Sequence, residues 1–102
     1  MLKNEKREGL SKLLRKMSKK GYYETLGFIS LKGSVHYAEI LDYDLKNDFV
    51  KSRATVTLIV RNLAALALIK RTVLDSRPVR TIYQPTERGK ELLRLLQAME
   101  QL

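Results

Sequence analysis

One short stretch of the chain carries side chains that could read the edges of DNA bases. Its members are arginines, hydroxyl residues and one apolar residue: Ser52, Arg53, Thr57, Leu58 and Arg61. An arginine can donate two hydrogen bonds to guanine, a threonine can bond several base edges, and a leucine can contact the methyl group of thymine. These types and spacings predict contacts in the major groove, with solvated helix charges as the alternative for the two arginines.

A second basic group surrounds residues 75–78, which have the composition of a tight turn. Arg77 and Arg80 lie in or beside this turn, and Asp75 could orient Arg77 through a charge-assisted hydrogen bond. Arginines at an exposed tip suit the narrow, electronegative minor groove. Other cations are expected to contact phosphates, which position a protein on DNA without reading its sequence. These are Lys32, Lys51, Lys70 and Arg71.

Residues for metal or covalent chemistry are sparse. The chain has no cysteine and one histidine, His36, which we expect to be structural or on the surface. Loosely spaced carboxylates predict a solvated acidic turn rather than a metal or acid–base site. They are Glu39, Asp42, Asp44 and Asp48. Because no phosphate-binding glycine loop or nucleophile–base pair is present either, we expect no cofactor, no catalytic residues and no enzyme activity.

The charge balance favours a polyanionic partner. Among 102 residues, 20 are Lys or Arg and 11 are Asp or Glu, which gives a net charge of +9. Such an excess of cations binds nucleic acid by displacing the counterions of phosphates. The length fits one domain, and no apolar run is long enough to cross a bilayer or to form the core of a signal peptide. We therefore expect a cytoplasmic protein without membrane contact.

The spacing of apolar residues and breaks predicts the elements that position these side chains. The expected order is helices over 1–20, 22–31 and 35–41, a polar turn over 42–48, a helix over 53–68, strands over 69–74 and 79–83, and a helix over 86–101. Ser52 and Thr86 are expected to cap the last two helices. Pro85 should end the second strand early, because proline has no N–H for the ladder.

The helix expected over 53–68 has two different faces. Apolar side chains at helical spacing predict its core face: Val56, Ile59, Val60 and Leu63. The opposite face is small and weakly charged: Ala54, Thr57, Leu58, Arg61 and Ala65, with Arg53 at its edge. A smooth face of this kind can enter the major groove deeply. A short helix, a capped longer helix and a hairpin together have the order of a helix-turn-helix with a wing.

Both ends of the chain carry apolar stripes that exceed what so short a core can bury. We expect them to form a homodimer interface: Leu10, Leu13, Leu14 and Met17 in the first helix, and Leu92, Leu95, Leu96 and Met99 in the last. Two-fold symmetry would set two equal helices one turn of DNA apart and so predicts a palindromic site. Residues 1–20 also carry a charge of 8 − 2 = +6, so the first helix could instead lie on DNA.

Several segments, in the right order, resemble one protein family. Residues 28–41 look like the first two helices of winged-helix regulators of the MarR, HxlR and PadR types, and residues 52–71 are similar to their recognition helix and first wing strand. Residues 77–92 resemble the wing and the Y-x-L-T-x-x-G-x-x-L entry to the last helix. The matching positions are Tyr83, Thr86, Gly89 and Leu92, and Pro85 stands in place of the leucine.

The resemblance implies a mainly helical α+β fold: a winged helix-turn-helix with a β-hairpin wing and extra N- and C-terminal dimerisation helices. It implies one domain over 1–102, with the core and wing over 22–85. It also implies a sequence-specific transcriptional regulator that acts as a repressor and occupies a promoter as a homodimer. A small-molecule effector is allowed by the resemblance, but no residue marks its pocket. An architectural DNA-binding protein of low specificity and a winged helix that binds proteins remain as alternatives.

Overall fold

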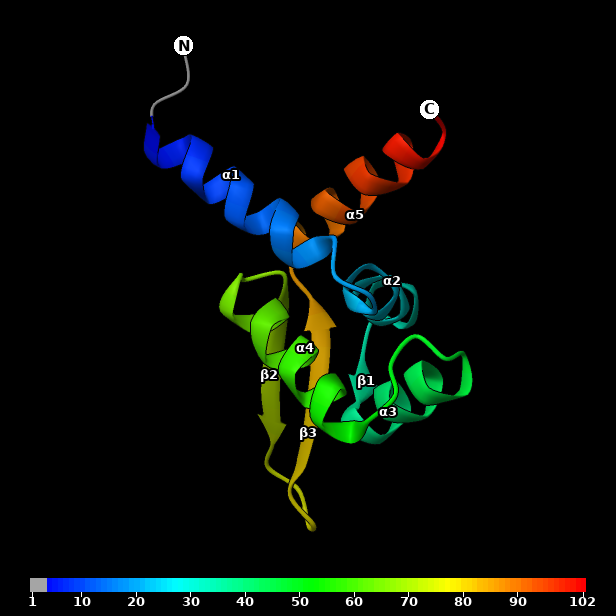
Figure 1. Cartoon of the computed structure of the whole chain (residues 1–102). Coiled ribbons are helices and arrows are strands. Elements are labelled where there is room, and N and C mark those ends of the chain that lie inside the picture. The colour runs from blue at the N-terminus through cyan, green and yellow to red at the C-terminus, as the bar shows by residue number, and fades with distance from the viewer. Residues whose placement is uncertain (1–3) are drawn as a thin grey trace.

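The computed structural model describes residues 4–102, with side chains from residue 6 onward; the first three residues of the helix expected over 1–20 lie outside this range. Helices dominate the fold and a small sheet lies among them (Figure 1). In chain order the elements are α1 (Asn4–Met17), α2 (Tyr22–Lys32), β1 (Val35–His36), α3 (Tyr37–Lys46), α4 (Arg53–Ala65), β2 (Ile69–Leu74), β3 (Arg80–Pro85) and α5 (Glu87–Glu100).

The three strands form an antiparallel sheet in the order β1-β3-β2. Hairpin β2–β3 confirms the expected pair of strands, and we call it the wing. Tyr83 lies at the centre of the sheet, opposite Val35 on one side and Arg71 on the other. Pro85 is the last residue of β3 and lies opposite Ile69. Because β1 pairs only with Ile82 and Tyr83, the missing N–H of Pro85 interrupts no bond on that side.

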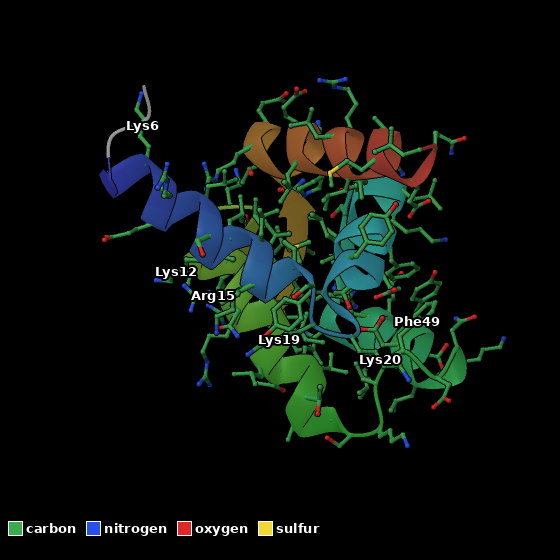
Figure 2. All side chains as sticks on the ribbon, turned by 45° about the horizontal axis from the view of Figure 1, so that its top comes forward. Lys6, Lys12, Arg15, Lys19, Lys20 and Phe49 are labelled. Atoms are coloured by element: carbon green, nitrogen blue, oxygen red, sulfur yellow. The ribbon has the colours of Figure 1, made fainter. Side chains whose placement is uncertain are left out.

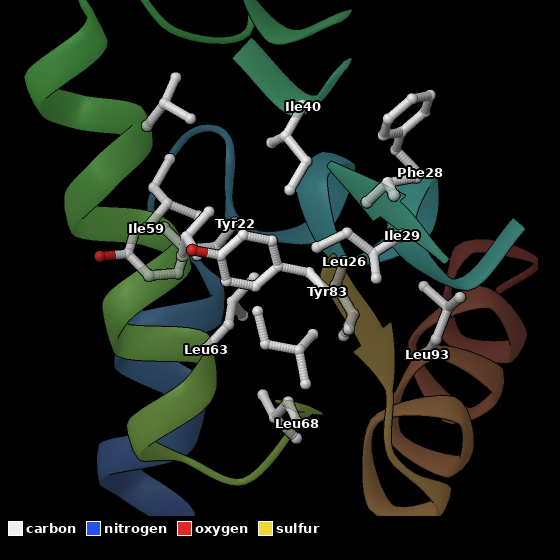
Figure 3. Close-up of a cluster of buried hydrophobic side chains, with 14 of the residues drawn as sticks. Tyr22, Leu26, Phe28, Ile29, Ile40, Ile59, Leu63, Leu68, Tyr83 and Leu93 are labelled. Carbon is white, nitrogen blue, oxygen red and sulfur yellow. The ribbon is translucent and has the colours of Figure 1, made fainter. Parts of the chain in front are cut away.

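The core lies where α2, α4 and the sheet meet (Figure 3). Leu26 and Ile29 of α2 are fully buried against Ile59 and Leu63 of α4 and Ile40 of α3. The core face predicted for residues 53–68 is therefore confirmed, because Val56, Ile59, Val60 and Leu63 are all buried. These contacts fix the direction of α4 and leave its opposite face exposed.

The region between α2 and α4 differs from its prediction. Residues 35–41 were expected as a helix, but Val35 and His36 form strand β1 and α3 begins only at Tyr37. The expected turn over 42–48 is wrong for most of its length, because α3 continues to Lys46. The cause is pairing with β3, whose partner residues Tyr83 and Ile82 lie far away in sequence and cannot be recognised from local periodicity.

Asp44 shows why α3 continues. It lies one helical turn after Ile40, on the same face, and both side chains are fully buried. Thr25 Oγ1 donates a hydrogen bond of 2.6 Å to Asp44 Oδ2, while Oδ1 has no partner among the described residues. The prediction of a solvated acidic turn is therefore wrong for this carboxylate. Burial raises the pKa of Asp44 above its usual value, and the hydrogen bond from Thr25 lowers it by less.

This burial makes stability depend on pH. Because the pKa of Asp44 is raised in the folded state, its stabilising contribution is complete below the usual value of 3.8 and is lost as the pH rises through the folded pKa. Asp44→Asn removes the ionisation. We expect the free energy of unfolding of the variant, relative to the wild type, to increase from about pH 4 to about pH 7. Urea denaturation at both pH values measures this difference, and a constant difference would contradict it.

The end of α4 and the start of α5 are joined by direct contacts. Helix α4 ends at Ala65 rather than at the expected residue 68, and Ala67 has a positive φ of 60°. The expected cap is present, because Thr86 Oγ1 accepts from Gly89 N at 3.0 Å. The same hydroxyl donates to the Ala67 carbonyl at 2.6 Å, and Thr86 N donates to the Leu68 carbonyl at 3.1 Å. We call this set of contacts the α4–α5 joint.

Helices α1 and α5 leave the body at the end opposite the wing tip and diverge (Figure 1). Met17, expected in a dimer interface, is instead buried in the core of its own chain, as is Leu93. Leu13, Leu92 and Leu96 are half-buried and pack against that core. The rest of the expected interface remains open to solvent: Leu10, Leu14, Leu95 and Met99.

Candidate nucleic-acid interface

Helix α4 begins where the sequence predicts. Ser52 is its N-cap, and its hydroxyl accepts a hydrogen bond of 3.2 Å from Thr55 N. Such a cap satisfies one of the free N–H groups of the first turn, and the remaining N–H groups favour an anion nearby. Lys51 lies exposed directly before the cap. The start of α4 therefore combines a positive helix end with a lysine side chain.

The outer face of α4 brings together the residues expected to read bases. A shallow recess on this face is lined by Arg53, Ala54, Thr57, Leu58 and Arg61. All five residues are exposed, and the small side chain of Ala54 leaves room between its larger neighbours. Leu58 is half-exposed although its side chain is apolar. The face thus presents donors, a hydroxyl and an apolar contact without a bulky obstruction.

Tyr37 also belongs to this surface. It is the first residue of α3, and its hydroxyl lies 2.7 Å from Thr57 Oγ1 and 3.2 Å from the Arg53 carbonyl. The Arg53 guanidinium lies 5.4 Å from the centre of its ring, which is within the range of a cation–π interaction. Without the start of α3, the sequence offered no signal for this contact.

A second cationic surface lies between α4 and the sheet. A cavity of about 300 Å³ opens there, with Arg61 on the α4 side and Arg71 and Tyr83 on the sheet side. Lys70 is the neighbour of Arg71 on β2, and it lines a different hollow with Gln84 and Lys90. Of the cations expected at phosphates, the structure therefore brings Arg71 beside α4 but not Lys70. Lys32 lies exposed at the end of α2, in neither group.

The wing presents its arginines to solvent. Arg77 and Arg80 are exposed at the turn and the start of β3. Ser76 Oγ donates a hydrogen bond of 2.8 Å to the Pro78 carbonyl, which ties the turn together. The expected ion pair of Asp75 with Arg77 is not among the salt bridges of the described residues. The arginines are therefore free of that constraint.

His36 has a structural role, as expected. Its backbone N–H donates to Glu39 Oε1 at 3.0 Å at the start of α3, and its ring Nδ1 lies 3.3 Å from the Thr81 carbonyl. Over residues 4–102, the structure contains no group of three or more His, Asp or Glu that could hold a metal ion. Within the same range, the helices are too short or too polar to cross a membrane.

Helices α3 and α4 and the wing define a winged helix-turn-helix. Solved structures share this fold. The reduced form of the transcriptional regulator YodB from Bacillus subtilis is 20% identical, with a TM-score of 0.76 over 98% of this chain and 89% of that one. The redox regulator HypR in its oxidised form is 20% identical, with a TM-score of 0.73 over 90% of each chain. A regulator of the MarR family from Porphyromonas gingivalis is 17% identical, with a TM-score of 0.69 over 90% and 85%.

The family follows from a direct sequence match. The model of the HxlR-like helix-turn-helix family matches residues 42–102, from the middle of α3 through α4, the wing and α5. The chain therefore belongs to the HxlR-like helix-turn-helix family, and the resemblance noted in its sequence is confirmed. No curated protein sequence matches the chain significantly. Helix-turn-helix regulators bind DNA with the second helix of the motif in the major groove. In this chain, α4 is the second helix of the motif.

Proposed function

We propose that the chain is a sequence-specific, double-stranded DNA-binding transcriptional repressor of the cytoplasm, and not an enzyme. In this proposal α4 lies in the major groove, and Arg77 and Arg80 of the wing approach the minor groove. The observation that carries it is the exposed outer face of α4, where Arg53, Thr57 and Arg61 surround a recess above Ala54. Such a face fits against base edges more closely than a helix with long charged side chains throughout.

Phosphate contacts would hold α4 in position. Arg71 faces the cavity between α4 and the wing, and Lys51 lies beside the helix N-terminus. Cations on both sides of a groove-binding helix suit the two phosphate strands that border the groove. The net charge of +9 supplies the long-range attraction. Repression follows sterically, because a protein bound at a promoter blocks access to it.

We propose a homodimer formed through α1 and α5. Leu95 and Met99 are 46% and 57% exposed on α5, and Leu10 and Leu14 are 49% and 43% exposed on α1. Because both helices project from the same end of the body (Figure 1), a second copy could cover both apolar faces at once. Its two-fold axis would make the preferred DNA site a palindrome.

Charged residues in the apolar face of α5 should dissociate the dimer. For the double variant Leu95→Glu with Met99→Glu, we expect the dimer dissociation constant to rise by at least about tenfold, because two carboxylates would be buried without partners. Sedimentation equilibrium measures this constant. Leu31→Glu is the matched control, because Leu31 is 84% exposed on α2 and lies outside the proposed interface. Equal dissociation constants for wild type and the double variant would contradict the interface.

The test of the proposed function is selection of sites from random duplex DNA, followed by salt titration. Enrichment of a palindrome supports a regulator, and each phosphate contact should add about −0.9 to the slope of log affinity against log salt. Binding without enrichment would instead support an architectural protein. The absence of binding at low salt would contradict any role on DNA and favour a protein-interaction module.

One observation favours the architectural alternative. Lys12 and Arg15 lie on α1 and Lys19 lies just after its end, and the three side chains lie along one side of this segment (Figure 2). A cationic stripe of this kind can follow a phosphate backbone without reading bases. If α1 lies on DNA, the double variant Lys12→Ala with Arg15→Ala should make the slope of log affinity against log salt less negative by about 2. If α1 serves only the dimer, the slope should stay unchanged.

A further inference from the structure

The hydroxyl of Tyr37 connects α3 to two positions of α4 that face solvent. It lies 3.2 Å from the Arg53 carbonyl and 2.7 Å from Thr57 Oγ1. Arg53 and Thr57 are one helical turn apart, and both line the recess on the outer face of α4. Tyr37 itself is only half-exposed. It therefore borders the base-reading surface and contacts two of its residues, but it does not line the recess itself.

The two hydrogen bonds can exist together in one arrangement only. A phenol hydroxyl carries a single proton, and a backbone carbonyl can only accept. The proton of Tyr37 must therefore go to the Arg53 carbonyl. The bond to Thr57 then requires the Thr57 hydroxyl to be the donor, and its proton points back toward Tyr37. What Thr57 presents to solvent is consequently the lone pairs of its oxygen.

We propose that Tyr37 is a specificity-determining residue that holds Thr57 as a hydrogen-bond acceptor. This inference rests on the proposed function, in which α4 reads the major groove. There, adenine presents an N6 amino group and cytosine an N4 amino group, whereas guanine and thymine present the acceptors O6, N7 and O4. A threonine that can only accept selects adenine or cytosine. An unconstrained threonine can rotate its proton, so that it either donates or accepts a hydrogen bond and can contact all four bases.

Arg53 complements this choice. Its guanidinium can only donate, and its position 5.4 Å from the centre of the Tyr37 ring orients it toward the same side of α4. One tyrosine thereby places a fixed donor and a fixed acceptor one turn apart on the helix. Arg53 can therefore bond a base edge that carries acceptors, and Thr57 can bond a base edge that carries an amino group, at neighbouring positions of the DNA site. The ring contacts the Arg53 guanidinium, whereas the hydroxyl bonds Thr57 and the Arg53 carbonyl. Removing the hydroxyl alone therefore keeps the ring contact and releases Thr57.

The experiment compares sites selected from random duplex DNA by the wild type, Thr57→Val, Tyr37→Phe and Tyr43→Phe. Thr57→Val identifies the base position that Thr57 reads, and the wild type should prefer adenine or cytosine there. For Tyr37→Phe we expect the preference at this position to fall by about 2- to 10-fold, toward equal use of all bases. The other positions and the affinity for unselected DNA should stay unchanged.

Tyr43→Phe is the matched control. Tyr43 also lies on α3, where its ring stacks on Phe28 at 4.1 Å, and its hydroxyl makes no hydrogen bond within the described residues. It should select the same sites as the wild type. Thermal unfolding of all variants measures any effect on the fold.

Four results would overturn the inference. They are a wild-type preference for guanine or thymine at the Thr57 position, no position that responds to Thr57→Val, an unchanged preference in Tyr37→Phe, or an equal loss at every position in that variant. The last result would show that Tyr37 merely supports the fold. Failure of the proposed function has a different signature, because the wild type would then enrich no site at all, and the inference would fall with it.

Discussion

Gly89→Ala is expected to lower the free energy of unfolding by about 3 kcal/mol or more. A Cβ added at Gly89 would lie 1.9 Å from the Leu68 carbonyl oxygen, with the Leu68 carbon and Cα also closer than ordinary contact. All three atoms belong to the backbone, which cannot turn aside as a side chain can. Relief of the clash would require the α4–α5 joint to open, and Thr86 would lose its bonds to Ala67 and Leu68. Urea denaturation measures the effect.

Gly9→Ala is the matched control for this experiment. Gly9 lies in the middle of α1, and a Cβ built there meets nothing within 4 Å. Because alanine has a higher helix propensity, this variant should be as stable as the wild type or more stable by up to about 1 kcal/mol. If Gly89→Ala also behaved in this way, α5 could not approach Leu68 as closely as the structure shows.

The affinity of the double variant Arg53→Ala with Arg61→Ala for its specific DNA site should fall by a factor on the order of 100 or more. Each arginine can make a bidentate contact to guanine, and both line the recess on the exposed face of α4. The folded state should change little, because neither side chain is buried. Fluorescence anisotropy on a selected duplex, at fixed salt, measures the loss, and circular dichroism checks the fold.

The charge-matched control is Lys12→Ala with Arg15→Ala on α1. It also removes two positive charges, but from α1, which leaves the body at the end opposite the wing tip (Figure 1). A general electrostatic effect would weaken binding equally in both double variants, whereas base reading by α4 would weaken it far more in the first. Equal losses would therefore contradict a special role for α4 and support contact of α1 with DNA.

The sequence was most informative where structure is local. The apolar spacing of Val56, Ile59 and Leu63, together with the Ser52 cap, predicted α4 and the face that it exposes. Two β-prone runs around a polar turn predicted the wing in the same way. These patterns need only neighbours within one or two turns, so they are readable without a fold. The end of α4 was predicted too late, at residue 68 instead of Ala65, because the αL conformation of Ala67 depends on its contact with Thr86.

Features that depend on distant partners were missed. Strand β1 exists because Val35 pairs with Tyr83, and Asp44 is buried because Thr25 of another helix donates to it. A carboxylate at the inner position of a helix looks like a break in the apolar pattern, so α3 was predicted too short. The same error hid Tyr37, because its contact with Thr57 requires the correct start of α3. The candidate site was therefore predicted in its exposed residues but not in the residue that borders them.

The α4–α5 joint leaves no hinge between the recognition helix and the C-terminal helix. Arg88 Nε donates to the Leu66 carbonyl at 3.0 Å, and Thr86 and Gly89 hold Ala67 and Leu68. Residues 66–68 directly follow α4, so a rotation of α5 must tilt α4 with it. Helix α5 thus acts as a lever whose free end carries Leu95 and Met99. A second copy that packed against this free end would therefore be connected to the C-terminal end of α4 by direct hydrogen bonds.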